Sequence, residues 1–299
     1  MSELEESVSR FKQIFEDSKL SPEAEINNVL IVIDETLQRE EFEFNLVDII
    51  HENTKASFTF LYAVRSYIQQ AKDDKIELET LPSLIKKIKD RYTDDSEVFS
   101  IAFIPDEDIK PYERIIEIIK KRNIDFLIIP APFTLFAEEE EQTEDSLGIT
   151  IDTVIMKILL EQKIPIFLVR QSQVLPFNKT KILIKETMFR KDFLGWARLL
   201  LADDALIEIF HSELNTSDLE RINLYLNVIK NKFEKEQRKL TINIIDGSYL
   251  LQDFCELLKE DREALLVFQA VKTSEDDSKR ITSALCYLNA NTLIFPPLD

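Results

Sequence analysis

The sequence predicts an α/β, Rossmann-like protein of two tandem units, each a five-stranded parallel sheet with helices on both faces. Three observations lead to this fold class. Short, nearly continuous apolar segments alternate with amphipathic stretches. The segments are rich in β-branched and aromatic residues, which is typical of strands buried on both faces. The whole order of segments occurs twice, and repeated strand, helix, strand predicts a parallel sheet between helical layers.

The first unit supplies five predicted strands and two clear helical stripes. The strands are expected at 28–36, 57–64, 97–104, 125–132 and 164–171. One apolar stripe has helical spacing at Leu81, Leu84, Ile85, Ile88 and Tyr92. A second, containing Ile115, Ile116 and Ile119, follows Pro111, a residue suited to the first turn of a helix.

The second unit repeats the order after a predicted linker at 171–180. Its strands are expected at 181–187, 205–212, 240–247, 264–271 and 291–298, and a long helix is marked by Leu219, Ile222, Leu226, Ile229 and Phe233. Trp196, beside Gly195, is expected to pack from a helix. We therefore expect an N-terminal helical extension at 1–25, a first domain at 26–172 and a second at 178–299.

Net charge and cysteine usage exclude several classes of function. A charge of −19 would repel a phosphate backbone and an anionic membrane surface, so nucleic acid is not an expected partner. An acidic N-terminus and the lack of a long apolar run predict a cytoplasmic protein without stable membrane insertion. Cys255 and Cys286 stand in no CxxC pattern and near no histidine pattern, so neither a disulfide framework nor a zinc site is expected.

Glycine occurs only at Gly148, Gly195 and Gly247. Phosphate-cradling loops need glycine where the backbone approaches the ligand. No GxGxxG, GxxxxGK[ST] or GxSxG motif is present. Rossmann dehydrogenases, P-loop NTPases and serine hydrolases are thereby excluded.

The unit resembles the universal stress protein family, which has an adenine-nucleotide hydrolase-like α/β fold. Asp34 ends the first predicted strand, and "IPIFLVR" at 164–170 matches the last strand of that family. The resemblance covers almost the whole chain as a tandem pair, except its first 25 residues. It implies a fold, a setting in stress response, and a nucleotide cleft that would lie around Asp34, Val64 and Thr153.

The resemblance also implies that the ATP-binding loop is degenerate. ATP-binding members carry glycines that fall here at about Pro130 and Phe133, and a Gly-[Ser/Thr] pair that falls at Asp152 and Thr153, of which only Thr153 fits. An insert adds six carboxylates: Glu138, Glu139, Glu140, Glu141, Glu144 and Asp145. In the second unit, Lys185 replaces the first-strand Asp and "KTSEDDSKR" contains no glycine. We expect neither unit to bind ATP in the manner of the family.

Other interpretations are weaker. The acidic insert could bind Mg²⁺ or Ca²⁺, but it lacks the glycine and alternating spacing of a calcium loop, so no metal site is expected. Asp34 with Glu35 could suggest a receiver domain, but Pro105 precedes Asp106 where a phosphorylatable Asp would stand. The sequence does not show a nucleophile or orienting carboxylate acting together with His51 or His211, which favours structural roles for both.

Assembly and function follow as expectations. An exposed apolar strand is an aggregation hazard, so "IPIFLVR" is expected to pair with "NTLIFPP" in an internal pseudo-dimer that leaves a homodimer open. Pro296 and Pro297 would limit that pairing. We expect a non-enzymatic scaffold or regulatory protein without a cofactor, acting through contacts with an unidentified protein. The alternatives are an ATP-binding or weakly hydrolysing protein and a cytosolic regulatory subunit of a membrane transporter.

Overall fold

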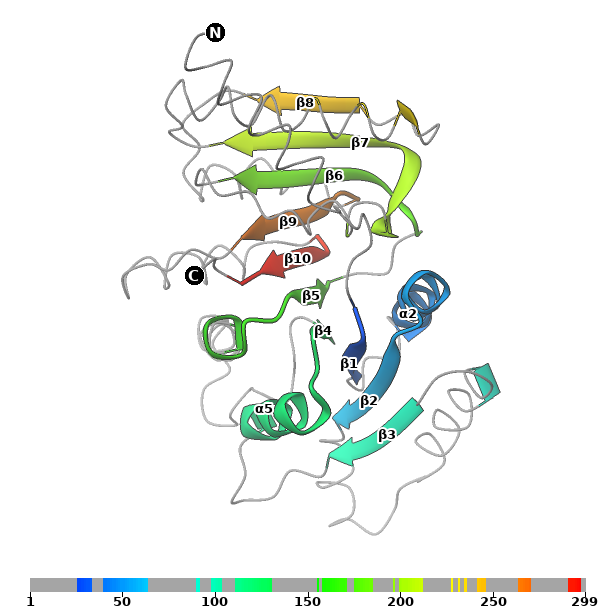
Figure 1. The fold of residues 1–299 in the computed structure, drawn as a ribbon, viewed down its shortest axis with the longest axis vertical. Coiled ribbons are helices and arrows are strands. Elements are labelled where there is room, and N and C mark those ends of the chain that lie inside the picture. Colours follow the sequence, from blue (N-terminus) through cyan, green and yellow to red (C-terminus); the bar gives the residue numbers. More distant parts are fainter. Residues whose placement is uncertain are drawn as a thin grey trace, which may run out of the picture.

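The computed structural model describes residues 26–33, 40–63, 90–91, 98–103, 111–130, 155, 158–170, 175–184, 196, 199–211, 227, 231, 234–235, 241–245, 263–269 and 290–296. These residues form one ten-stranded sheet in the order β3-β2-β1-β4-β5-β10-β9-β6-β7-β8 (Figure 1). All neighbouring strands are parallel except β5 and β10, which run antiparallel. The predicted α/β class with a mainly parallel sheet is confirmed.

Each strand of the first half lies inside its predicted segment. The strands are β1 (Asn28–Ile33), β2 (Ser57–Ala63), β3 (Val98–Phe103), β4 (Phe126–Pro130) and β5 (Ile166–Val169). The central residues of β1, β2, β4 and β5 are buried on both faces, as continuous apolar runs require. Among the described residues of this half, the longer helical elements are α2 (Glu40–Thr54), α5 (Pro111–Arg122) and the π-helical turn η3 (Ile158–Gln162).

In the second half, two strands begin earlier than predicted. The strands are β6 (Phe177–Ile184), β7 (Leu201–His211), β8 (Thr241–Ile245), β9 (Leu265–Gln269) and β10 (Thr292–Phe295). The prediction that 177–180 belong to a linker is wrong. Phe177 is buried beside Phe167 with ring centroids 6.4 Å apart, and the Thr180 hydroxyl donates to the Leu265 carbonyl at 2.8 Å. Both contacts are with residues of other strands. The polar residues around 177–180 therefore gave no sign of them in the sequence.

Strand β7 starts directly after the helical residues Leu199 and Leu200. Its register with β6 shifts, because Phe177 pairs with Leu201 and Lys179 pairs with Leu206. Between these two pairs, β7 therefore has more residues than the start of β6, which is the arrangement of a bulge.

Two apolar cores lie on opposite faces of the sheet. The α2 side chains Phe44, Val47 and Ile50 pack in one core with alternate residues of β1 and β2. The α5 side chains Ile115, Ile118 and Ile119 pack in the other core with the remaining alternate residues. The stripe predicted after Pro111 is thus the buried face of α5. Of the stripe predicted at 81–92, only residues 90–91 are described, and they are helical.

Three helices reach their strands through the same kind of turn. Lys55 after α2, Asn123 after α5 and Lys163 after η3 have φ angles of 56°, 50° and 54°. Such left-handed residues commonly end helices, and glycine is the usual choice there. The Lys55 amide donates to the His51 carbonyl at 3.2 Å, and the Ile124 amide donates to the Ile119 carbonyl at 3.0 Å. The latter is the longer bond of a Schellman motif.

One of the two cores continues through the junction between the halves. Trp196, from the helical residues before β7, packs against Phe126 of β4 with ring centroids 4.2 Å apart. The same ring lies 6.1 Å from Phe295 of β10. Trp196 is 4% exposed, which confirms its expected role in packing and places it against both halves.

Candidate functional site

The candidate site lies at the carboxyl ends of the strands, where the strand order reverses. From β1 the chain passes to β2 on one side, while β4 pairs with the other side of β1. In open parallel sheets, ligands bind in the crevice at such a switch point. Ile33, Ala63 and Pro130 are the residues that end β1, β2 and β4 there.

Two of the three site residues predicted from the sequence directly follow these strands in the chain. Asp34 follows Ile33, and Val64 follows Ala63. Both lie outside the described residues, as do Thr153 and the acidic insert. Their grouping around one cleft therefore remains a prediction.

Pro130 is the described residue nearest to the predicted ligand loop. It is still part of β4 and stands in register with Val169 of β5. A proline has no N–H, so this position cannot donate a backbone hydrogen bond to a phosphate. In the second half, β6 ends at Ile184 and β9 at Gln269, and the loops that follow lie outside the described residues.

A polar cluster occupies the opposite, amino edge of the first half. The Asp125 carboxylate accepts from the Asn27 amide at 2.9 Å, the Asn27 side chain at 3.1 Å and the Asn28 amide at 3.0 Å. The Asp125 amide donates in return to the Asn28 carbonyl at 3.0 Å. Burial raises the pKa of Asp125, although these donors act in the opposite direction. The cluster joins the starts of β1 and β4, and sequence reasoning missed it.

A second missed cluster lies on the sheet of the second half. The Glu208 carboxylate of β7 lies 3.3 Å from the Lys179 amine and 3.9 Å from the Lys181 amine of β6. Lys181 is 8% exposed, and its amine lies 6.0 Å from the Phe210 ring centroid. Lys181 pairs with Leu266 and Glu208 in register, as Leu30 pairs with Leu127 and Thr59 in the first half. An ion pair thus replaces an aliphatic and a hydroxyl side chain at equivalent positions.

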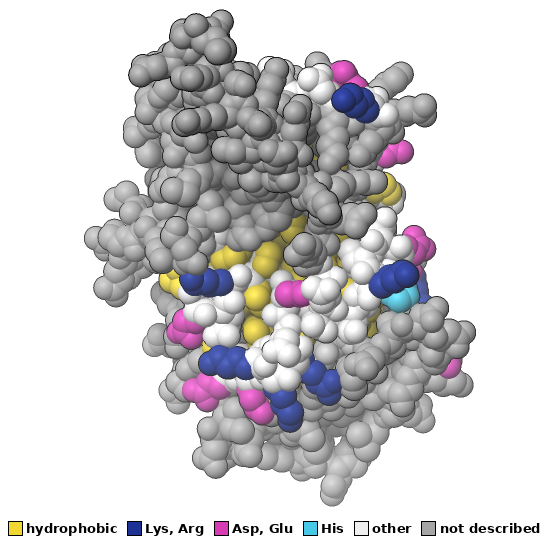
Figure 2. Space-filling view, in the orientation of Figure 1, with side chains coloured by type: hydrophobic (Ala, Val, Ile, Leu, Met, Phe, Trp, Pro, Cys, Tyr) yellow, Lys and Arg dark blue, Asp and Glu magenta, His cyan; other side chains and the backbone are white. Residues whose placement is uncertain are grey.

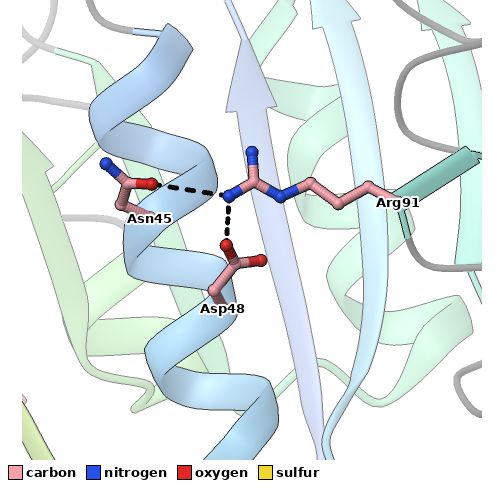
Figure 3. A network of polar contacts seen from close by, with 3 residues as sticks. All are labelled: Asn45, Asp48 and Arg91. Carbon is pink, nitrogen blue, oxygen red and sulfur yellow. Dashed lines mark hydrogen bonds and ion pairs between the residues drawn. The ribbon is translucent and has the colours of Figure 1, made fainter.

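A polar network on the surface joins α2 to the segment before β3. The Arg91 guanidinium donates to the Asp48 carboxylate and, at 3.4 Å, to the Asn45 side-chain oxygen (Figure 3). It also lies 5.5 Å from the Phe44 ring centroid. The ion pair is partly exposed, so its contribution to stability is expected to be small.

The two predicted structural histidines occupy different places. His51 lies in the last turn of α2, with its ring edge against Phe58 at a centroid distance of 5.9 Å. His211 is the last residue of β7. Among the residues that the structure describes, no three His, Cys, Asp or Glu residues are grouped so that they could hold a metal ion.

On the face drawn in Figure 2, acidic and basic side chains of the described residues are interspersed, and hydrophobic side chains show between them together with backbone and polar atoms. No helix within the described ranges is long and apolar enough to cross a membrane.

Comparisons with known proteins establish the fold. No protein-family model and no curated protein matches the sequence. A universal stress protein from Archaeoglobus fulgidus DSM 4304 has a similar structure, with a TM-score of 0.60, 13% identity, and coverage of 94% of this chain and 99% of that one. The fold is that of the universal stress proteins.

Two further structures share this universal-stress-protein-like fold. A putative universal stress protein from Pseudomonas aeruginosa UCBPP-PA14 gives a TM-score of 0.54 at 13% identity, covering 91% of this chain and 94% of that one. The cytoplasmic domain of a prokaryotic cation chloride cotransporter gives a TM-score of 0.51 at 12% identity, covering 91% and 96%. Identities this low establish the fold alone, so function must be argued from the residues.

Proposed function

We propose that this chain is a non-enzymatic scaffold or regulatory protein with a universal-stress-protein-like fold, without the glycine-rich ATP-binding loop, and acting through protein contacts. The observation that carries the proposal is Pro130, which stands in β4 where the resemblance predicts the first loop glycine. Because it has no N–H, the chain leaves the strand without a donor at that point. The sequence adds Phe133 and Asp152 at the other glycine positions.

Electrostatics favours the same proposal. A helix N-terminus offers a phosphate about 0.3 to 2 kcal/mol. Two like charges about 4 Å apart repel by about 1 kcal/mol in water and about 4 kcal/mol near a protein surface. The six carboxylates between 138 and 145 would oppose a triphosphate in the same loop, and they suit a basic protein partner.

The rival is a protein that binds adenine nucleotide through Asp34, Val64 and Thr153, with weak ATP hydrolysis as its extreme form. Calorimetric titration of the whole chain with ATP and Mg²⁺ separates the two. We expect no binding in the micromolar range. Micromolar binding that Asp34→Ala abolishes would overturn the proposal. Asp204→Ala is the matched control, because it removes an exposed carboxylate from β7.

A second candidate function is that of a cytosolic regulatory subunit for a membrane transporter. It is favoured by the likeness to the cytoplasmic domain of a cation chloride cotransporter. Cross-linking in native cells, followed by identification of the captured proteins, tests it. Recovery of a transporter supports this candidate, whereas recovery of soluble proteins alone contradicts it.

We further propose that 26–172 and 178–299 are tandem domains that form an internal pseudo-dimer in a stress-response setting. Support comes from the strand order, which reads 3-2-1-4-5 outward to inward in the first half and 8-7-6-9-10 in the second. The antiparallel pairing of β5 with β10 is the contact that such a pseudo-dimer needs. This pairing lies within one chain, so it does not decide whether two chains associate.

A further inference from the structure

The two strands at the junction are flanked by different residues at equivalent positions. The Leu127 amide donates to the Pro165 carbonyl at 3.1 Å, and the Leu266 amide donates to the Asn291 carbonyl at 2.9 Å. Pro165 and Asn291 directly precede β5 and β10. These bonds make Pro165 the equivalent of Asn291. After four strand residues in each case, Arg170 is the equivalent of Pro296.

A hydrogen bond crosses the junction between two of these flanking residues. The antiparallel register pairs Phe167 with Leu293 at its centre, which places the end of β5 beside the start of β10. There the Arg170 amide donates to the Asn291 side-chain oxygen at 2.8 Å. Asn291 is 0% exposed. The corresponding contact at the other end would join Pro165 to Pro296, which offer neither a side-chain acceptor nor an N–H.

We propose that this hydrogen bond determines which strands pair: it makes β5 the preferred partner of β10 and disfavours the pairing of either strand with its own copy in a second chain. The bond therefore favours the pairing of β5 with β10, which we call an unlike junction. It disfavours β5–β5 and β10–β10 pairing between two chains, which we call like junctions. This inference rests on the strand register and not on the proposed function.

The alternatives are disfavoured because neither of them provides this hydrogen bond. If β5 paired with β5 of a second copy, Pro165 would stand opposite the Arg170 amide, without a side-chain acceptor. If β10 paired with its copy, Pro296 would stand opposite the Asn291 side chain, without an N–H. Asn291 is fully buried, so loss of this bond to its side chain carries a desolvation cost, and such mismatches provide specificity.

The proposal predicts that stability and pairing preference can be separated. Asn291→Ala leaves the Arg170 amide without this acceptor, and Arg170→Pro leaves Asn291 without this donor. Each is expected to destabilise the fold and so to raise the unfolding equilibrium constant about tenfold. Their combination removes both groups and is expected to recover most of that loss. However, the two single variants and the double variant all lack the bond. In each of them we therefore expect the preference for β5–β10 pairing over pairing with a second copy to be lost. Arg170→Ala, which keeps the amide, is the control for the side chain.

A cysteine reporter measures the pairing. All chains carry Leu293→Cys with Cys255→Ser and Cys286→Ser, so only residue 293 can form a disulfide. In a β10 pair with its own copy, the two residues 293 would face each other at a Cα distance of about 4.5 to 5.5 Å, which a disulfide can bridge. An exchanged β5–β10 junction would place residue 293 opposite 167 and give no such product. Chains are refolded at roughly millimolar concentration, comparable to the effective concentration of a short tether.

We expect mild oxidation to yield disulfide-linked dimer from the Asn291→Ala, Arg170→Pro double variant at a level at least about tenfold above the reporter parent. Thr292→Val is the stability control. Its hydroxyl is equally buried but donates to the Ala290 carbonyl within its own strand end, at 2.9 Å. The proposal is overturned if the double variant yields no more dimer than the parent, or if Thr292→Val yields as much as the double variant.

Discussion

At the scale of single residues, the polar side chains that the structure brings together form hydrogen bonds and ion pairs that link neighbouring strands. Asp125 ties the start of β4 to Asn27 and Asn28 at the start of β1. Glu208 bridges two lysines of β6 immediately after the register shift in β7. Both clusters sit beside strand ends or irregularities, where backbone pairing alone specifies the register least.

Asp125→Asn tests the hydrogen-bonded cluster at the amino edge of the first half. We expect the free energy of unfolding to fall by about 1 kcal/mol, because an amide offers one oxygen where the carboxylate offers two to the Asn27 and Asn28 donors. Urea denaturation of both proteins at matched pH measures the difference.

The pH dependence of that difference has a definite sign. Burial raises the folded-state pKa of Asp125 above the ordinary value of 3.8. The contribution of Asp125 itself is therefore complete below 3.8 and declines as the pH rises through the folded-state pKa. The gap between the native protein and Asp125→Asn should narrow over that interval. A gap that widens with rising pH would show that the folded-state pKa lies below the unfolded one.

At the scale of elements, the helix-to-strand turns explain how the chain folds with three glycines. Lysine or asparagine adopts the left-handed conformation after α2, α5 and η3. This conformation costs an ordinary L-residue about 1 to 2 kcal/mol, and asparagine less. The packing of the following buried residues, such as Ala56 and Ile124, offsets the cost.

Lys55→Gly should therefore stabilise the protein. We expect a gain of about 0.5 to 1 kcal/mol, because relief of the left-handed strain exceeds the extra entropy of glycine in the unfolded chain. Thermal and urea denaturation measure it. Asn123→Gly should gain less, and Lys55→Ala should gain nothing. An equal gain from Lys55→Ala would mean that the lysine side chain, and not the backbone, is responsible.

At the scale of the whole molecule, we expect the junction to make the two halves one cooperative folding unit. Trp196 contacts Phe126 of the first half and Phe295 of the second, inside a core whose described residues extend from β2 to β7. Since this is the only tryptophan in the chain, its fluorescence reports directly on the junction.

We expect the unfolding transitions followed by Trp196 fluorescence and by far-ultraviolet circular dichroism to coincide, because a continuous core favours cooperative unfolding. Trp196→Ala should lower the free energy of unfolding by about 3 to 5 kcal/mol. Trp196→Phe, which keeps an aromatic ring, should cost less. If the fluorescence transition precedes the dichroism transition, the halves separate before they unfold, and the junction is not part of one cooperative unit.

Much of the fold could be predicted because the apolar pattern of a buried strand is local. The segments around Leu30, Phe60, Ile128 and Phe167 read as strands and are strands. The start of β6 could not be predicted, because Phe177 is ordered by Phe167 and not by its polar neighbours. The grouping of Asp34, Val64 and Thr153 stays a prediction, since all three lie outside the described residues.

By itself, the sequence determined the alternation of strands and helices, the negative charge and the scarcity of glycine, because each is a property of composition or of short-range periodicity. Only the tertiary structure decided that Asn291 meets Arg170, that Asp125 meets Asn27 and Asn28, and that Trp196 lies between the halves. These partners are far apart in the sequence. Their contacts depend on the order and register of the strands in the completed sheet.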